Sequence, residues 1–247
     1  MPNQINVDQL LIDLRNAATA AEFEVQTYGQ VNHWSLYGFI RRATGSHEGS
    51  QQVYISSGIH GDEPVGPLAL LELLRNDALP RDCDLWLCPL MNPAGLAADT
   101  RENPQAIDLN RDYTDFVSPE IAAHRDWGTQ HIQRLDLALH LHEDWESTGF
   151  YLYELNFDGQ PSRSPAILKA VGAHLPIETA RLIDDHPARD GIIRPQTMPE
   201  VPEGLPEALY FKQHFGGINH TLETPSSLPL AQRLAGMQAA VLAAIGP

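Results

Sequence analysis

"QVYISSGIHGDEPVGPLALLELLR", residues 52–75, joins a strand pattern, a polar junction and a helix pattern in one stretch. Residues 52–56 are typical of a buried strand and residues 67–75 of a helix, with Pro64 suited to a first helical turn. The junction holds His60, Asp62 and Glu63, and Gly61 allows the backbone to turn tightly there. Ligands of open α/β sheets bind beyond the carboxyl ends of the strands, so the junction is a candidate site.

Strand and helix patterns alternate along the rest of the chain, with no obvious linker between them. This alternation predicts an α/β three-layer sandwich, in which a mixed, largely parallel sheet is covered by helices on both faces. A single domain over residues 1–247 is expected from the length. The expected strands are 23–28 and 34–40 (which could form a hairpin), 52–56, 84–90, 135–142, 150–155 and 219–224, and the expected helices are 7–21, 67–75, 119–134 and 230–245.

The composition excludes several classes of partner. The formal net charge is −16, from 32 acidic and 16 basic residues, which disfavours binding to nucleic acid or to an anionic membrane surface. No stretch approaches the roughly 18 apolar residues of a membrane span, and the N-terminus lacks the pattern of a signal peptide. We therefore expect a cytoplasmic protein. Its oligomeric state stays open.

The two cysteines are expected to be reduced. Cys83 and Cys88 lie at the start of and within one predicted strand at an odd spacing, which points their side chains to opposite faces of the sheet. Side chains on opposite faces do not form a disulfide with each other.

Histidine and glutamate recur at the spacing of a metal-ligand pair. Chance predicts about 0.7 His-x-x-Glu pairs in this composition, and the chain has three, at His60/Glu63, His140/Glu143 and His220/Glu223. Spacing alone does not choose between them. The position of His60 and Glu63 at a strand-to-helix junction favours this pair as ligands of one catalytic zinc ion, which needs a third protein ligand from elsewhere.

The strand at 135–142 supplies candidates for that third ligand. Strand alternation places Asp136, Ala138, His140 and His142 on one face, so parity does not separate the two histidines. His142 is nearer the carboxyl end of the strand and is our prediction for the ligand. His140 is predicted to lie deeper, as a supporting or simply buried histidine.

Two further groups have both a functional and an ordinary interpretation. Glu223 ends a short strand and is a candidate base, although these residues alone favour a solvent-facing glutamate on an edge strand. The turn-rich loop at 92–113 holds Arg101, Asn110 and Arg111. Arginines near a metal suggest capture of an anionic substrate group, whereas Arg111 could also pair only with Asp108 or Asp112.

Four segments together resemble the zinc carboxypeptidase superfamily. That superfamily includes murein peptide amidases and the aspartoacylase and succinylglutamate desuccinylase branch. The resemblance covers residues 53–225, most of the chain, and its most specific part is the second segment. The segments are "GIHGDEP" (58–64), "NPAGLAADTRENPQAIDLNRDY" (92–113), "LALHLHE" (137–143) and "TLETP" (221–225).

The resemblance implies a role for each candidate residue. It implies one zinc ion per chain on His60, Glu63 and His142, and Glu223 as the general base. It also implies that Asn110 and Arg111 hold a substrate carboxylate, while Arg101 polarises the scissile carbonyl or helps to bind the substrate.

Three features depart from the pattern of the family. Many relatives have Asp-x-His in the third-ligand strand, and His140 stands in place of that aspartate. "NPAG" replaces the commoner "NPDG". No motif places a tyrosine, and Tyr210 is the nearest candidate.

Two hydrolase classes and one binding class fit these residues. The first is a metallocarboxypeptidase or peptide amidase that cleaves an amide bond next to a free carboxylate, in a small peptide. The alternative is an N-acyl-amino-acid deacylase of the aspartoacylase or succinylglutamate desuccinylase type. Deacylase relatives resemble this core with a further β-rich domain, and the short stretch after Glu223 favours the first class. A complete set of base and ligands argues against a non-catalytic metal-binding module. The proline-rich stretch at 184–206 is expected to be a long loop that shapes the pocket.

Overall fold

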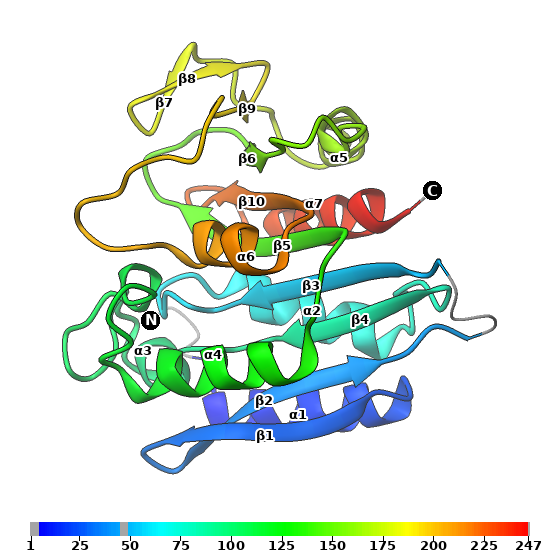
Figure 1. Cartoon of the computed structure of the whole chain (residues 1–247), viewed down its shortest axis with the longest axis vertical. Helices are drawn as coiled ribbons and strands as arrows, with labels where there is room; N and C mark the ends of the chain where they lie inside the picture. The colour runs from blue at the N-terminus through cyan, green and yellow to red at the C-terminus, as the bar shows by residue number, and fades with distance from the viewer. Residues whose placement is uncertain (1–4, 45–48, 247) are drawn as a thin grey trace.

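The junction of residues 58–64 connects β3 (Gln51–Ser57) to α2 (Val65–Arg75), as the sequence predicts. The structure is a computed structural model that describes residues 5–44 and 49–246. Helices cover both faces of a central sheet (Figure 1). This arrangement confirms the predicted three-layer α/β sandwich.

The sheet follows the order β1-β2-β4-β3-β5-β10-β6-β9-β8-β7. The four central strands, β4, β3, β5 and β10, run parallel to one another. Across the whole sheet, five neighbouring pairs are antiparallel and four are parallel, so the predicted parallel character belongs mainly to the centre. The other strands are β1 (Glu24–Val31), β2 (Trp34–Arg41), β4 (Cys83–Cys88), β5 (Leu137–Asp144), β6 (Tyr151–Leu155), β7 (Leu182–Ile183), β8 (His186–Arg189), β9 (Ile192–Ile193) and β10 (Ile218–Pro225).

Strand alternation divides the core into two layers. On β5, Leu137, Leu139 and Leu141 pack into one apolar layer, whereas Ala138 packs into the other. Residues of α1, α2, α5 and α7 fill the first layer, and residues of α4 and α6 the second. The helices are α1 (Val7–Ala20), α2, α3 (Pro93–Ala98), α4 (Pro119–His131), α5 (Ser164–Val171), α6 (Glu207–Phe215) and α7 (Leu230–Ile245), and one 3-10 turn, η1, spans Leu109–Arg111.

Both cysteines are free and buried in β4. Cys83 packs into the first apolar layer and Cys88 into the second, as their odd spacing predicts. Within the described residues, no helix is both long and apolar enough to cross a membrane.

The sequence interpretation missed several elements. The stretch at 184–206 is not only a loop, because β8 and β9 lie within it and join the sheet beside β6. The helices α5 and α6 were not predicted either. All but two residues of α6 are buried, so this helix lacks the polar stripe that marks a surface helix.

Two buried histidines predict how stability depends on pH. Burial lowers the pKa of His124 and of His220 to about 4, whereas an unfolded histidine titrates near about 6.5. Both folded-state pKa values lie below the unfolded value, so this contribution to stability is complete above pH ~6.5 and is lost as the pH falls toward ~4. Each histidine is expected to remove on the order of 1–3 kcal/mol over that window.

Denaturant unfolding at several pH values measures this effect. The variant His220→Gln, compared with the unaltered protein, is expected to lose less stability between pH 7 and pH 4.5. Parallel pH profiles for the two proteins would contradict the assignment.

Candidate metal centre

His60, Glu63 and His142 converge on one point at the carboxyl ends of β3 and β5. Their ligand atoms all lie within 4.8 Å of one another, and all three residues are buried. The two carboxylate oxygens of Glu63 lie 2.6 Å from Nδ1 of His60 and 2.8 Å from Nδ1 of His142. Two imidazole nitrogens and a carboxylate around one point are a donor set that fits zinc. These residues could therefore hold a metal ion.

The turn between β3 and α2 holds the first two of these residues in place. A Cβ atom on Gly61 would come within 2.0 Å of the backbone carbon of Gly95, in α3, so only glycine fits this close approach. Glu63 also accepts a hydrogen bond from the backbone N–H of Glu143, at 3.1 Å, next to His142 on β5. Backbone contacts from two neighbouring segments thus fix the approach of the turn to β5.

The carboxylates and imidazoles of the cluster shift one another's pKa values. Burial by itself raises the pKa of Glu63, but the adjacent His60 and His142 outweigh it and hold this pKa well below its usual range. Burial lowers the pKa of His142, whereas the carboxylates of Glu63 and Asp108 overcome burial and raise the pKa of His60. The carboxylate of Asp108 lies 3.3 Å from Nε2 of His60, on the side of the ring away from Glu63. The sequence indicated Asp108 only as a possible partner of Arg111, and its place beside Nε2 of His60 was not predicted.

The structure separates the two histidines that strand parity leaves equivalent. His142 lies against Glu63, with 4.9 Å between its ring centroid and that of His60. His140 instead lies among Ser56, Glu207 and Asn219 in the interior. This placement agrees with the prediction that His142 is nearer the site and His140 lies deeper.

Glu223 lies beside His142, because β10 runs parallel to β5 with these two residues in register. Its side chain lines the same cavity as the cluster, and β10 is flanked by β5 and β6, so Glu223 is not on an edge strand. Burial, together with the negative charges of Glu63, Asp144 and Asp184, raises the pKa of Glu223 well above its usual value. A cation bound by the cluster would oppose those charges and favour the carboxylate form.

Arg101, Asn110 and Arg111 line this cavity too. Arg101 pairs with Asp108 at 3.1 Å and lies 3.7 Å from Glu63. Within the described residues, Arg111 forms no ion pair with Asp108 or Asp112; its guanidinium donates to the backbone carbonyl of Asn110 at 2.8 Å. The structure therefore does not contain the ion pair of Arg111 with Asp108 or Asp112 that the sequence left open.

The cavity that contains these residues has a volume of about 670 Å³. The proline-rich stretch supplies one wall, through residues that include Pro195, Pro199 and Val201, which agrees with its expected part in shaping the pocket. Tyr210 does not line the cavity; it stacks on His214 inside α6, at 3.9 Å between ring centroids. Among the described tyrosines, Tyr153 lines the cavity. Its hydroxyl donates a hydrogen bond to the carboxylate of Asp184, which also lines the cavity.

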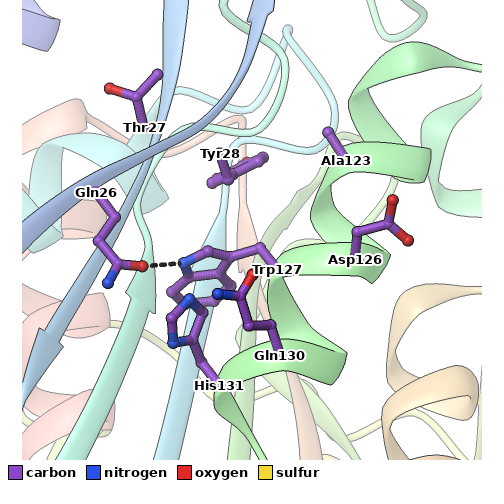
Figure 2. Close-up of a pocket in the computed structure, with 8 residues that line it drawn as sticks. All are labelled: Gln26, Thr27, Tyr28, Ala123, Asp126, Trp127, Gln130 and His131. Atoms are coloured by element: carbon purple, nitrogen blue, oxygen red, sulfur yellow. Dashed lines mark hydrogen bonds between the residues drawn. The ribbon is translucent and has the colours of Figure 1, made fainter.

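A second cavity, of about 570 Å³, lies between β1 and α4 (Figure 2). Its walls include Gln26 and Trp127, whose indole N–H donates to the Gln26 side chain at 2.9 Å. None of the candidate residues lies there. The converging ligand atoms make the first cavity the candidate active site.

Comparison with known proteins also indicates a hydrolase. The family "Succinylglutamate desuccinylase/Aspartoacylase catalytic domain" matches residues 50–181, more than half of the chain. Carboxypeptidase SOL1 of Arabidopsis thaliana is 36% identical over 72 residues, which are 25% of this chain and 15% of that protein. The chain thus spans a small part of the length of this relative.

Solved structures match over nearly the whole chain. A candidate metallopeptidase from Shewanella denitrificans is 25% identical with a TM-score of 0.82, covering 96% of this chain and 88% of that one. A metallo-carboxypeptidase from Pseudomonas aeruginosa, in complex with (2-guanidinoethylmercapto)succinic acid, is 19% identical with a TM-score of 0.67, covering 95% of this chain and 67% of that one. The second likeness, at this identity, concerns the fold alone.

Proposed function

Because the chain belongs to the succinylglutamate desuccinylase/aspartoacylase catalytic domain family, and is thus a hydrolase of the zinc carboxypeptidase superfamily, we propose that it cleaves an amide bond next to a free carboxylate. The observation that carries this proposal is one cavity lined by His60, Glu63, His142 and Glu223 together with Arg111. Residues 1–247 would act as one catalytic domain with one zinc ion.

Each side chain has a defined part in this reaction. Zinc, when bound by His60, Glu63 and His142, supplies Lewis acidity that polarises a carbonyl and acidifies water. Glu223 takes the proton of the attacking water and later delivers it to the leaving amine. Arg101, beside Glu63, is placed to stabilise negative charge on the carbonyl oxygen.

Arg111 and Asn110 hold the substrate carboxylate in this proposal. Among the described residues, no carboxylate lies within ion-pair distance of the Arg111 guanidinium, and a planar fork can bind a carboxylate through two hydrogen bonds. Fixing the carboxylate selects the adjacent amide bond for cleavage, because the reacting carbonyl is then held at a set distance from the metal ligands.

We favour small peptides as substrates, hence a metallocarboxypeptidase or peptide amidase. The likeness to the candidate metallopeptidase from Shewanella denitrificans, over 96% of the chain, supports this class. An N-acyl-amino-acid deacylase is the second candidate, and the family match at residues 50–181 supports it. Both classes need the same carboxylate clamp, and the predicted cytoplasmic location stays a prediction.

Paired substrates with a free or an amidated terminal carboxylate test the clamp. Amidation is expected to lower kcat/KM of the unaltered enzyme on the order of 10²-fold, because it leaves the half-buried charge of Arg111 without a partner. In Arg111→Lys the penalty for amidation should shrink, since both changes remove one interaction. Zinc content should not change.

Two outcomes would contradict the proposal. If neither acid nor amide peptides nor N-acyl amino acids are hydrolysed by the zinc-loaded protein, the proposed reaction is wrong. If amidation costs the variant as much as the unaltered enzyme, Arg111 does not hold the carboxylate. Comparing peptides with N-acyl amino acids in the same assay decides between the two substrate classes.

A further inference from the structure

Glu207 is a buried carboxylate with no part in the reaction described above. It is the first residue of α6 and is 1% exposed. One carboxylate oxygen accepts a hydrogen bond from the Tyr54 hydroxyl at 2.7 Å, and the other accepts one from the Ser56 hydroxyl at 2.8 Å. The second oxygen also lies 3.2 Å from Nδ1 of His140. These contacts tie the first turn of α6 to β3 and β5.

The backbone N–H of Glu207 contacts a residue that lines the cavity. Its N–H donates to the side-chain oxygen of Asn110 at 2.9 Å. Pro206, the N-cap residue of α6, offers no side-chain cap, so Asn110 satisfies a helix N–H that would otherwise lack a partner. The contact also fixes which way the Asn110 amide points.

The orientation of this amide matters for substrate binding. The oxygen of the Asn110 amide accepts from Glu207, and both N–H donors of the amide NH₂ group stay available to the cavity that Asn110 lines. No described residue accepts a hydrogen bond from that NH₂ group. A pair of free N–H donors beside Arg111 is suited to a carboxylate.

Glu207 therefore contacts both Asn110, on the substrate-binding side of the site, and the strands that lead to the proposed metal ligands. Its carboxylate is held by β3, which leads to His60, and lies next to His140 of β5, the strand that carries His142. We propose that Glu207 is a positioning residue. It fixes the Asn110 amide as a hydrogen-bond donor to the substrate carboxylate, at a set distance from the metal ligands. This inference rests on the proposed function.

The same buried network offers a matched control. The Tyr54 hydroxyl donates to Glu207, so it accepts from Nε2 of His124 at 2.8 Å, and Nδ1 of His124 in turn accepts from the Tyr113 hydroxyl at 2.8 Å. Burial lowers the pKa of His124 to about 4, which agrees with a neutral ring that donates on one side and accepts on the other. Tyr113→Phe removes a hydrogen bond at the far end of this network and leaves Glu207 in place.

The experiment compares Glu207→Gln, Tyr113→Phe, Asn110→Ala and the double variant of Glu207 and Asn110. Steady-state kinetics on acid and amide substrate pairs are combined with calorimetric titration of the metal-free proteins with the amino acid product. Glu207→Gln is expected to raise KM for the acid and the product Kd about tenfold, the scale of one hydrogen bond to a charged group. It should change kcat and the amide reaction less.

The preference for the acid over the amide substrate is the decisive measurement, because a purely structural role of Glu207 would leave this preference unchanged. The losses from Glu207→Gln and Asn110→Ala should not add in the double variant, because they act through one contact. Tyr113→Phe should lower the melting temperature and leave the acid-to-amide preference unchanged. If Glu207→Gln does not fold, Ser56→Ala, which removes one contact of the carboxylate, is expected to raise the product Kd about threefold.

The two proposals fail in different ways. Absence of hydrolysis by the unaltered protein would overturn the proposed function. An active protein in which Glu207→Gln, or Ser56→Ala in its place, leaves product Kd unchanged, or weakens acid and amide substrates equally, would overturn the positioning role alone.

Discussion

Replacing Glu223 by glutamine is expected to lower kcat by at least about 10²-fold, the usual contribution of general acid–base catalysis. The substitution keeps the shape of the side chain but removes its capacity to take a proton from water. Glu223 lies in register with His142 and is not among the three residues whose ligand atoms converge, so zinc content and fold should persist. Kinetics with elemental analysis and circular dichroism on the same samples measure all three properties.

Glu200→Gln is the matched control for this experiment. Glu200 is an exposed glutamate that lines the same cavity, so its variant changes the charge of the pocket by the same amount. We expect its kcat to stay within about twofold of the unaltered enzyme, as for most surface substitutions. Normal turnover in Glu223→Gln would remove Glu223 from the mechanism, and equal losses in both variants would indicate a general effect of charge.

Loss of the metal is expected to abolish turnover. The unaltered protein should carry about one zinc ion per chain, and His142→Ala should weaken zinc binding by more than about 10²-fold, since changes to supporting residues alone cost about 10–100-fold. Chelation followed by zinc addition should restore activity in the unaltered protein and not in the variant at the same zinc concentration. Inductively coupled plasma mass spectrometry gives the zinc content.

His140→Ala distinguishes the ligand from its neighbour on β5. We expect this variant to keep zinc, because His140 contacts Ser56, Glu207 and Asn219 and not Glu63. Its melting temperature should fall, since the buried charge of Glu207 loses a partner. Retention of zinc in His142→Ala together with its loss in His140→Ala would reverse the assignment.

Local sequence was sufficient for the strand-to-helix junction and for the two faces of β5. Alternation placed His140 and His142 on one face, and nearness to the strand end favoured His142, which is the histidine that lies against Glu63. The hairpin of β1 and β2 and the opposite faces of the two cysteines also followed from short-range patterns.

Groups whose partners are distant in sequence could not be predicted. Glu207 lies 153 positions from Tyr54 and 97 from Asn110, so nothing in its local pattern marks it as a link between them. Tyr153 likewise acquires its place in the cavity from the pairing of β6 with β10, and no motif in the sequence distinguishes it from Tyr210. A helix such as α6, buried almost all round, has no amphipathic period to detect.

The cavity has two walls of different kinds. The proposed metal ligands and Glu223 come from or follow central strands of the sheet, whereas the stretch at 184–206 contributes exposed residues such as Asp184, His186 and Glu203. Substitutions in exposed segments are tolerated far better than those in a packed sheet. Natural variation, or directed evolution, can therefore change which substrates enter the cavity while the proposed catalytic residues stay the same.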